Sequence, residues 1–263
     1  LEAAAFVSPK WVPQMADGAD VLAGLRALPD IQEHTVSYSA LVPNLKGMEA
    51  AIEAGVQEAV VFTAASEAFT QKNINCTIAE SIERFKPVAA LAQAHNIHLR
   101  GSISCALGCP YQGEVPVQSA AEVALRLRDI GVQEFDVADT IGVGTALRVS
   151  HVFEAVGYSV GLNNVAGHFH DTYGQALANI LAALQLGVST FHSSIAGLGG
   201  CPYAKGATGN VATEDVVYLL QGMGIDTGID LDALVDAGQY ISEHLGRPSG
   251  SRVARALIAK RVG

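Results

Sequence analysis

The chain has 263 residues, of which 49% are hydrophobic and 16% charged, enough apolar sequence for one large buried core or two smaller ones. Its formal net charge of −10 argues against a nucleic-acid surface, although a small anionic ligand needs only local positive charge. No apolar run approaches the roughly 18 residues of a membrane-spanning helix. The four cysteines include no Cys-x-x-Cys pair, which favours a reducing compartment over a disulfide framework.

Short apolar runs alternate with helical patterns along the whole chain. The runs that we interpret as strands cover residues 1–6, 35–41, 58–62, 97–103, 134–137, 165–170 and 189–195. Most of them are apolar on both faces, as expected of a parallel sheet that is covered by helices.

Amphipathic patterns fill the intervals between these runs. Thr77 and Glu80 form a capping box at the start of one helix, in which Pro87 is expected to cause a kink or a split. After the last predicted strand, apolar periodicity predicts terminal helices over residues 216–220, 231–245 and 251–258.

This regular alternation predicts an α/β fold with a parallel sheet, either a (β/α)8 barrel or a doubly wound sheet. No glycine-rich dinucleotide-binding or P-loop fingerprint follows any strand. Polar residues instead gather after the C-terminal ends of many strands at once, which is typical of a TIM barrel. We therefore predict one TIM-barrel catalytic domain over residues 1–263, with seven of the eight barrel strands and additional C-terminal helices.

Two histidines, His168 and His170, end one of the apolar runs. On a strand, residues i and i+2 point to the same face, so the two imidazoles would lie side by side as ligands for a divalent metal. The alternative is two ordinary histidines that neighbours or water satisfy. Asn210 offers a third ligand, and we expect a carboxylate from Asp171 or from a residue outside this sequence to complete the set.

Other candidate residues lie at or near strand ends. Asp139 could orient a ligand or act as an acid or base, but an aspartate before a glycine-rich turn is also a common capping residue. Residues 197–210 contain five glycines, which indicates a mobile loop with an accessible thiol at Cys201. That thiol could transfer a proton, or it could be incidental to a flexible connector. In a barrel, these residues would converge on one face together with Glu2 and the histidine pair.

Four stretches carry a resemblance that covers essentially the whole chain. They are FVSPKWVPQM at residues 6–15, DTIGVG at 139–144, HFHDTYGQALAN at 168–179 and GLGGCPYAKGATGN at 197–210. In these stretches the sequence resembles the 3-hydroxy-3-methylglutaryl-CoA lyase family of metal-dependent TIM-barrel enzymes.

The resemblance implies cleavage of 3-hydroxy-3-methylglutaryl-CoA into acetyl-CoA and acetoacetate, a reaction of leucine degradation and ketone-body formation. It implies Mg²⁺ or Mn²⁺ as the cofactor. The residues that match the family's metal ligands are His168, His170 and Asn210, and those that match its catalytic groups are Cys201, Asp139 and Glu2. In the family, an aspartate on the first strand also binds the metal.

The sequence departs from the family in two places. It begins at what resembles the family's second strand, so the first strand, which carries an arginine and the metal-binding aspartate, is expected to be absent. His192 stands where the family is expected to have an aspartate. The first departure raises the alternative of an inactive barrel fragment. A related carboligase of the isopropylmalate- or homocitrate-synthase type is the other alternative.

The expected partner is a small acyl-CoA substrate, with no nucleic acid and no membrane. Four lysines near strand ends could meet its phosphates, namely Lys10, Lys46, Lys72 and Lys205. A homodimer is one option for the oligomeric state. We expect a bacterial cytoplasmic protein, with the mitochondrial matrix as the alternative.

Overall fold

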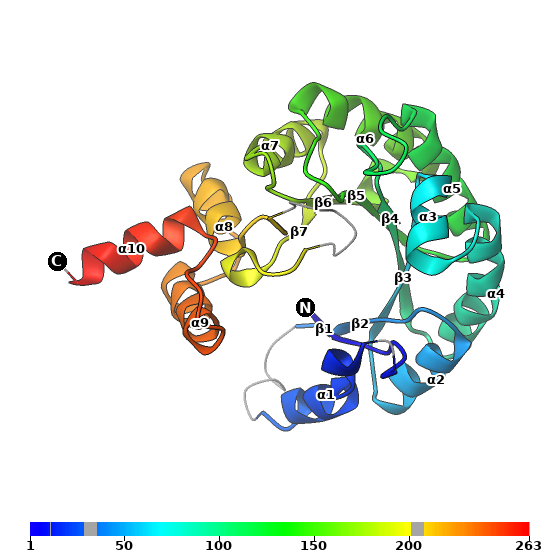
Figure 1. Cartoon of the computed structure of the whole chain (residues 1–263), viewed down its shortest axis with the longest axis horizontal. Helices are drawn as coiled ribbons and strands as arrows, with labels where there is room; N and C mark the ends of the chain where they lie inside the picture. Colours follow the sequence, from blue (N-terminus) through cyan, green and yellow to red (C-terminus); the bar gives the residue numbers. More distant parts are fainter. Residues whose placement is uncertain (11, 29–35, 201–207, 263) are drawn as a thin grey trace.

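The computed structural model describes residues 1–10, 12–28, 36–200 and 208–262. The strands are β1 Glu2–Ala5, β2 Ser39–Leu41, β3 Glu58–Ala64, β4 His98–Ser104, β5 Glu134–Asp139, β6 Val165–Phe169 and β7 Thr190–His192. They form one seven-stranded parallel sheet, in which the order of the strands follows the order of the chain. Figure 1 shows that this sheet curls around an axis, so the predicted α/β barrel with seven strands is confirmed.

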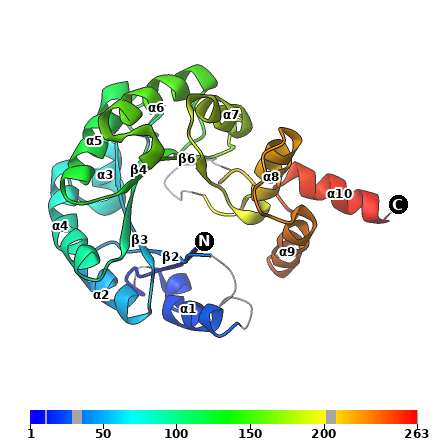
Figure 2. The same ribbon diagram turned by 180° about the vertical axis from the view of Figure 1, so that it is seen from behind.

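Helices connect the strands and cover the outer side of the curl. The α-helices are α1 Gly18–Arg26, α2 Leu45–Glu53, α3 Glu67–Ile74, α4 Ile78–Ala94, α5 Val117–Asp129, α6 Ala146–Val160, α7 Ala176–Leu186, α8 Thr213–Gly222, α9 Leu231–His244 and α10 Arg252–Val262. Short 3-10 helices are η1 Pro13–Met15, η3 Leu162–Asn164 and η4 Ile195–Gly197. Helices α2, α4, α5, α6 and α7 lie along the outer side of the sheet (Figures 1 and 2), while α8 to α10 follow β7.

The apolar core lies between the outer face of the sheet and these helices. Phe135 and Val137 of β5 and Phe169 of β6 are at most 1% exposed. Phe169 stacks against Phe153 of α6 with ring centroids 5.8 Å apart. Because side chains alternate across a strand, the neighbours of these residues in sequence point into the barrel interior.

Two local predictions differ from the structure. The run at 189–195 is a shorter strand, because the chain turns into η4 at Ile195 and Ala196 adopts a left-handed conformation. Of the kink or split expected at Pro87, the split is wrong, since helix α4 continues from Ile78 to Ala94, and the kink stays a prediction. The proline is exposed, while Phe85 and Val88 on either side of it are buried, so packing stabilises the turns around it.

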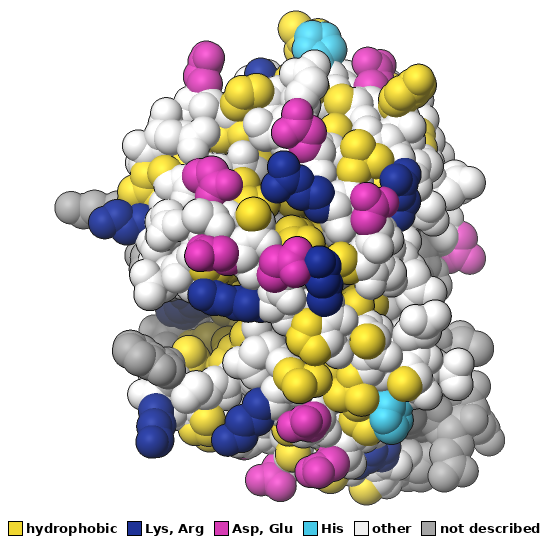
Figure 3. All heavy atoms as spheres, turned by 90° about the vertical axis from the view of Figure 1, so that its right-hand side faces the viewer, with side chains coloured by type: hydrophobic (Ala, Val, Ile, Leu, Met, Phe, Trp, Pro, Cys, Tyr) yellow, Lys and Arg dark blue, Asp and Glu magenta, His cyan; other side chains and the backbone are white. Residues whose placement is uncertain are grey.

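The surface carries charges of both signs. On the face shown in Figure 3, lysine and arginine side chains are interspersed with aspartate, glutamate and hydrophobic side chains. Among the described residues, no helix has the length and apolar character needed to cross a membrane.

Candidate metal-binding active site

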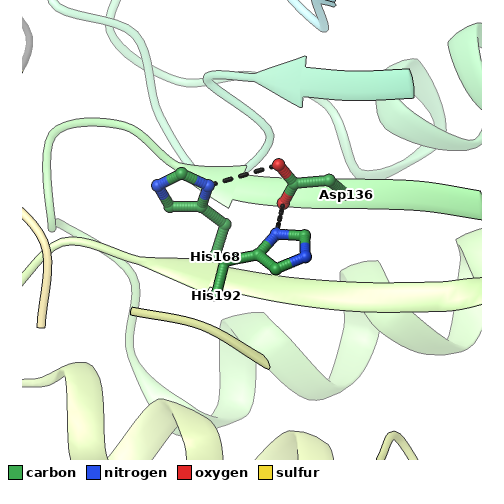
Figure 4. Close-up of side chains that lie close together, drawn as sticks. All are labelled: Asp136, His168 and His192. Carbon is green, nitrogen blue, oxygen red and sulfur yellow. Dashed lines mark hydrogen bonds and ion pairs between the residues drawn. The ribbon is translucent and has the colours of Figure 1, made fainter. Parts of the chain in front are cut away.

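A cluster of polar side chains from three neighbouring strands lies in the barrel interior. Asp136 of β5, His168 of β6 and His192 of β7 point toward one another (Figure 4). His168 is level with His192 in the strand register, and Asp136 lies one step deeper, level with Ala166. Their ligand atoms lie within 4.8 Å of one another, close enough to hold a divalent ion.

Asp136 lies between the two imidazoles. His168 Nδ1 lies 3.2 Å from Asp136 Oδ2 and forms a hydrogen bond with it. His192 Nδ1 lies 3.3 Å from Asp136 Oδ1, at ion-pair distance. Burial alone would raise the pKa of Asp136, but the two imidazoles hold it well below its ordinary value. The carboxylate is therefore ionised in its buried position.

The second nitrogen of His168 faces an amide oxygen. His168 Nε2 lies 2.7 Å from Asn210 Oδ1. The Asn210 amide is held in this orientation because its Nδ2 donates a hydrogen bond to the Leu198 carbonyl at 3.1 Å. If Nδ1 of a neutral His168 carries the proton and donates it to Asp136, Nε2 has an unshared electron pair. Nε2 and Asn210 Oδ1 are then two hydrogen-bond acceptors that lie 2.7 Å apart.

Two acceptors at this distance repel each other unless a proton or a cation lies between them. A proton on His168 is one solution: burial alone would lower the pKa of His168, but Asp136 raises it above the ordinary value. A divalent cation that binds Nε2 and Oδ1 together is the other solution. The donor set thus fits a metal ion.

His170 lies beside His168 and has a ring nitrogen that could bind a metal. Its backbone forms a bridge with Asn210, and its ring centroid lies 5.6 Å from that of His168. The side chain is buried, and among the described residues its Nδ1 has no hydrogen-bond partner. Burial and the nearby His168 lower the pKa of His170 to about 4, so the ring is neutral near pH 7 and can donate an electron pair.

Arg100 of β4 closes the cluster at its deeper end. Its Nη1 lies 2.7 Å from His192 Nε2, and its Nη2 lies 2.6 Å from a carboxylate oxygen of Glu2. Its Nε lies 3.4 Å from Glu58. The predicted residue Glu2 therefore contacts the cluster through Arg100.

The structure separates Asp139 from this interior cluster. Asp139 is three residues from Asp136 on β5, so the two side chains point to opposite faces of the sheet. Asp139 is fully buried and accepts hydrogen bonds from Gly144 N–H at 2.8 Å and Val143 N–H at 3.1 Å. Burial raises the pKa of Asp139 to about 6, although these backbone donors oppose the shift. A carboxyl group with this pKa can exchange protons near neutral pH. The catalytic role of Asp139 stays a prediction.

Two other expectations have different outcomes. Asp171 accepts a hydrogen bond from Ala176 N–H at 3.0 Å at the start of α7, and it is not one of the clustered side chains Asp136, His168 and His192. Cys201 lies outside the described residues. Asp136 was not among the residues predicted from the sequence. It lies two residues before Ala138, which pairs with His168 in the neighbouring strand, so Asp136 and His168 share one face of the sheet.

The fold and the site together define an α/β barrel with a candidate divalent-metal site in its interior. A family model described as HMGL-like matches residues 2–241. The chain belongs to this HMGL-like family.

Individual relatives agree with this assignment. A 3-hydroxy-3-isohexenylglutaryl-CoA/hydroxy-methylglutaryl-CoA lyase from Pseudomonas aeruginosa is 59% identical over 260 residues, which cover 99% of this chain and 85% of the relative. The mitochondrial hydroxymethylglutaryl-CoA lyase of Mus musculus is 54% identical over 256 residues, 97% of this chain and 77% of the relative.

Solved structures show the same similarity. The crystal structure of hydroxymethylglutaryl-CoA lyase from Pseudomonas aeruginosa matches with a TM-score of 0.93 and 59% identity, over 98% of this chain and 84% of that one. An HMG-CoA lyase from Acinetobacter baumannii in complex with coenzyme A and 3-methylmalate matches with a TM-score of 0.90 and 33% identity, over 97% of this chain and 82% of that one.

Proposed function

We propose that this protein is a divalent-metal-dependent carbon–carbon lyase that cleaves 3-hydroxy-3-methylglutaryl-CoA into acetyl-CoA and acetoacetate. The observation that carries the proposal is the 2.7 Å approach of His168 Nε2 to Asn210 Oδ1, beside the neutral ring of His170. The names of the similar proteins support the lyase and not the carboligase.

The metal is proposed to be Mg²⁺ or Mn²⁺, as the resemblance implies; the amide oxygen suits these ions, and the two imidazoles suit other divalent ions such as Zn²⁺ or Fe²⁺ as well. His168, His170 and Asn210 would hold it. When bound, the ion would polarise the substrate hydroxyl and an acyl oxygen and lower the pKa of that hydroxyl.

The remaining chemistry needs two proton transfers by residues of the chain. Loss of the hydroxyl proton lets the bond between the two product fragments break, and the acetyl-CoA enolate that leaves must then gain a proton. We assign Asp139 a supporting part in this exchange, as the resemblance implies; burial raises its pKa to about 6, and its carboxylate lies on the opposite face of β5 from Asp136. We assign the final protonation to Cys201, as the resemblance implies.

The two flanks of the glycine-rich stretch lie beside the site, which supports the role of Cys201. Leu198 accepts the hydrogen bond from the Asn210 amide at 3.1 Å. A Cβ atom on Gly209 would lie 1.8 Å from the Gly199 carbonyl oxygen, so only glycine permits this close approach. Cys201 follows Gly200 directly in the sequence.

An acyl-CoA ligand is consistent with the related structure that contains coenzyme A. Of the four lysines considered, Lys46 lines a hollow of about 360 Å³ near the ends of β1 and β2, together with Phe6, Ser8 and Asn44. A cation there can meet a phosphate group. We further propose a bacterial cytoplasmic location, because one relative is a Pseudomonas protein, and a homodimer, which light scattering would test.

The test is an acetoacetate assay with purified protein, Mg²⁺ or Mn²⁺, and 3-hydroxy-3-methylglutaryl-CoA. The isohexenyl analogue in the name of the Pseudomonas relative is tested in parallel by release of acetyl-CoA, because its cleavage gives a longer 3-keto acid in place of acetoacetate. Acetoacetate that appears only with metal supports the proposal. A protein that condenses acetyl-CoA with a keto acid and releases no acetoacetate would be the carboligase, and a folded protein without either activity would be the inactive barrel.

A further inference from the structure

We propose that Asp136 and His192 are positioning residues: Asp136 accepts the Nδ1–H of His168, lies at ion-pair distance from Nδ1 of His192, and thereby presents Nε2 of His168 to the metal. The inference rests on the proposed function in one respect, the place of the metal beside His168, His170 and Asn210. It assigns roles to two side chains that the resemblance did not include among the site residues.

Arg100 contacts His192 and fixes which of its ring nitrogens carries the proton. A guanidinium group has only N–H donors and stays protonated in proteins. His192 Nε2, at 2.7 Å from Arg100 Nη1, must therefore be the acceptor and carry no proton. Glu134 cannot replace Arg100 as the partner in this position, because its oxygen lies 3.8 Å from the same nitrogen, beyond hydrogen-bond distance.

The proton of His192 must then lie on Nδ1, since a neutral imidazole has one N–H group. That atom lies 3.3 Å from Asp136 Oδ1. Asp136 Oδ1 is buried and has no well-aligned hydrogen-bond donor among the described residues, so it relies on His192 for compensation of its charge. An Nδ1–H group has no electron pair for a metal, and this excludes His192 as a ligand.

Asp136 fixes the tautomer of His168 in the same way. Asp136 Oδ2 lies 3.2 Å from His168 Nδ1 and accepts its N–H. The remaining electron pair lies on Nε2, which faces Asn210. A carboxylate that holds one nitrogen of a metal-binding histidine fixes its tautomer and raises the electron density of the other nitrogen.

A metal ion between Asp136, His168 and His192 is the competing arrangement, because their ligand atoms lie close enough. The Arg100 guanidinium lies next to that position, at 2.7 Å from the His192 ring, and its positive charge would repel a second cation in a buried environment. Ligation by His192 would also require the loss of its remaining proton. The geometry therefore favours an ion on the Asn210 side of His168.

Nitrogen NMR of protein labelled with ¹⁵N-histidine tests this directly, with Zn²⁺ as a diamagnetic probe and assignments from single substitutions. We expect His192 to carry its proton on Nδ1 with and without Zn²⁺, and the metal-induced shift of His168 to fall on Nε2. A metal-induced shift on Nδ1 of His168 or of His192 would overturn the inference and make the three residues the metal ligands.

The variant Asp136→Asn provides a second test. Asparagine keeps one acceptor but replaces the other oxygen with a donor, so one of the two Nδ1–H groups would face a donor and its ring would have to move or change tautomer. We expect a fall of about 10- to 100-fold in Mn²⁺ affinity by calorimetry, with a changed ¹⁵N pattern for His168. The matched control, Asp20→Asn on the exposed surface of α1, should bind Mn²⁺ like the unmodified protein.

The outcomes separate this inference from the proposed function. Zn²⁺ on Nε2 of His168 in a protein that yields no acetoacetate would leave the positioning roles intact and reject the reaction. An active lyase whose Asp136→Asn variant keeps its Mn²⁺ affinity and its His168 tautomer would reject the positioning roles. If Asp136→Asn does not fold, the spectra of the unmodified protein decide alone.

Discussion

The pKa of Asp139 predicts a measurable pH dependence of stability. The carboxyl group titrates at about 6 in the folded protein against an ordinary value of 3.8. Between these two values the folded protein binds the proton more tightly than the unfolded chain, so the contribution of Asp139 to stability falls as the pH rises. The difference of roughly 2 pKa units corresponds to about 3 kcal/mol in total, of which about 1 kcal/mol is lost between pH 5 and pH 7.

The variant Asp139→Asn isolates this effect because it does not titrate. Urea unfolding of both proteins in EDTA, at several pH values from about 5 to about 7, gives the difference in unfolding free energy. We expect the unmodified protein to lose about 1 kcal/mol relative to the variant over this range. A difference that stays constant, or that changes in the opposite direction, would show that burial does not raise the pKa of Asp139.

Three further substitutions follow from the structure. Asn210→Ala should weaken Mn²⁺ binding at least about 10-fold in calorimetry, because it removes one of the converging acceptors; unchanged affinity would contradict the ligand set. Phe169→Ala should lower the unfolding free energy by about 3–5 kcal/mol in urea, since Phe169 is fully buried against Phe153, and a loss below about 1 kcal/mol would contradict that packing. Gly209→Ala should abolish acetoacetate release, because φ is +105° and the new Cβ would collide with Gly199; normal activity would exclude the close approach as a requirement.

The parts of the fold that the sequence predicted are those that local periodicity determines. Each of the seven predicted strands overlaps an observed one, because a covered parallel strand is a short apolar run between turn residues. The side-by-side placement of His168 and His170 follows from the two-residue period in the same way.

The remaining features depend on contacts between distant parts of the chain. Asp136 lies within the predicted strand 134–137, but only the register between neighbouring strands brings it to His168 and His192. Asp171 shows the opposite case, because its proximity to the histidines in sequence suggested a ligand while the start of α7 takes its carboxylate. A local hydrogen bond to a helix N-terminus competes with any more distant use of such a side chain.

Arg100 has a consequence for how the barrel unfolds. The first and last strands, β1 and β7, lie at opposite ends of the sheet order, so among the described strands no ladder of backbone hydrogen bonds joins them. The guanidinium of Arg100, in the middle strand β4, contacts Glu2 of β1 and His192 of β7. If β1 or β7 separated from the sheet, the buried Arg100 guanidinium would lose a hydrogen-bond partner, which costs free energy. We therefore expect both ends of the sheet to open in one cooperative transition.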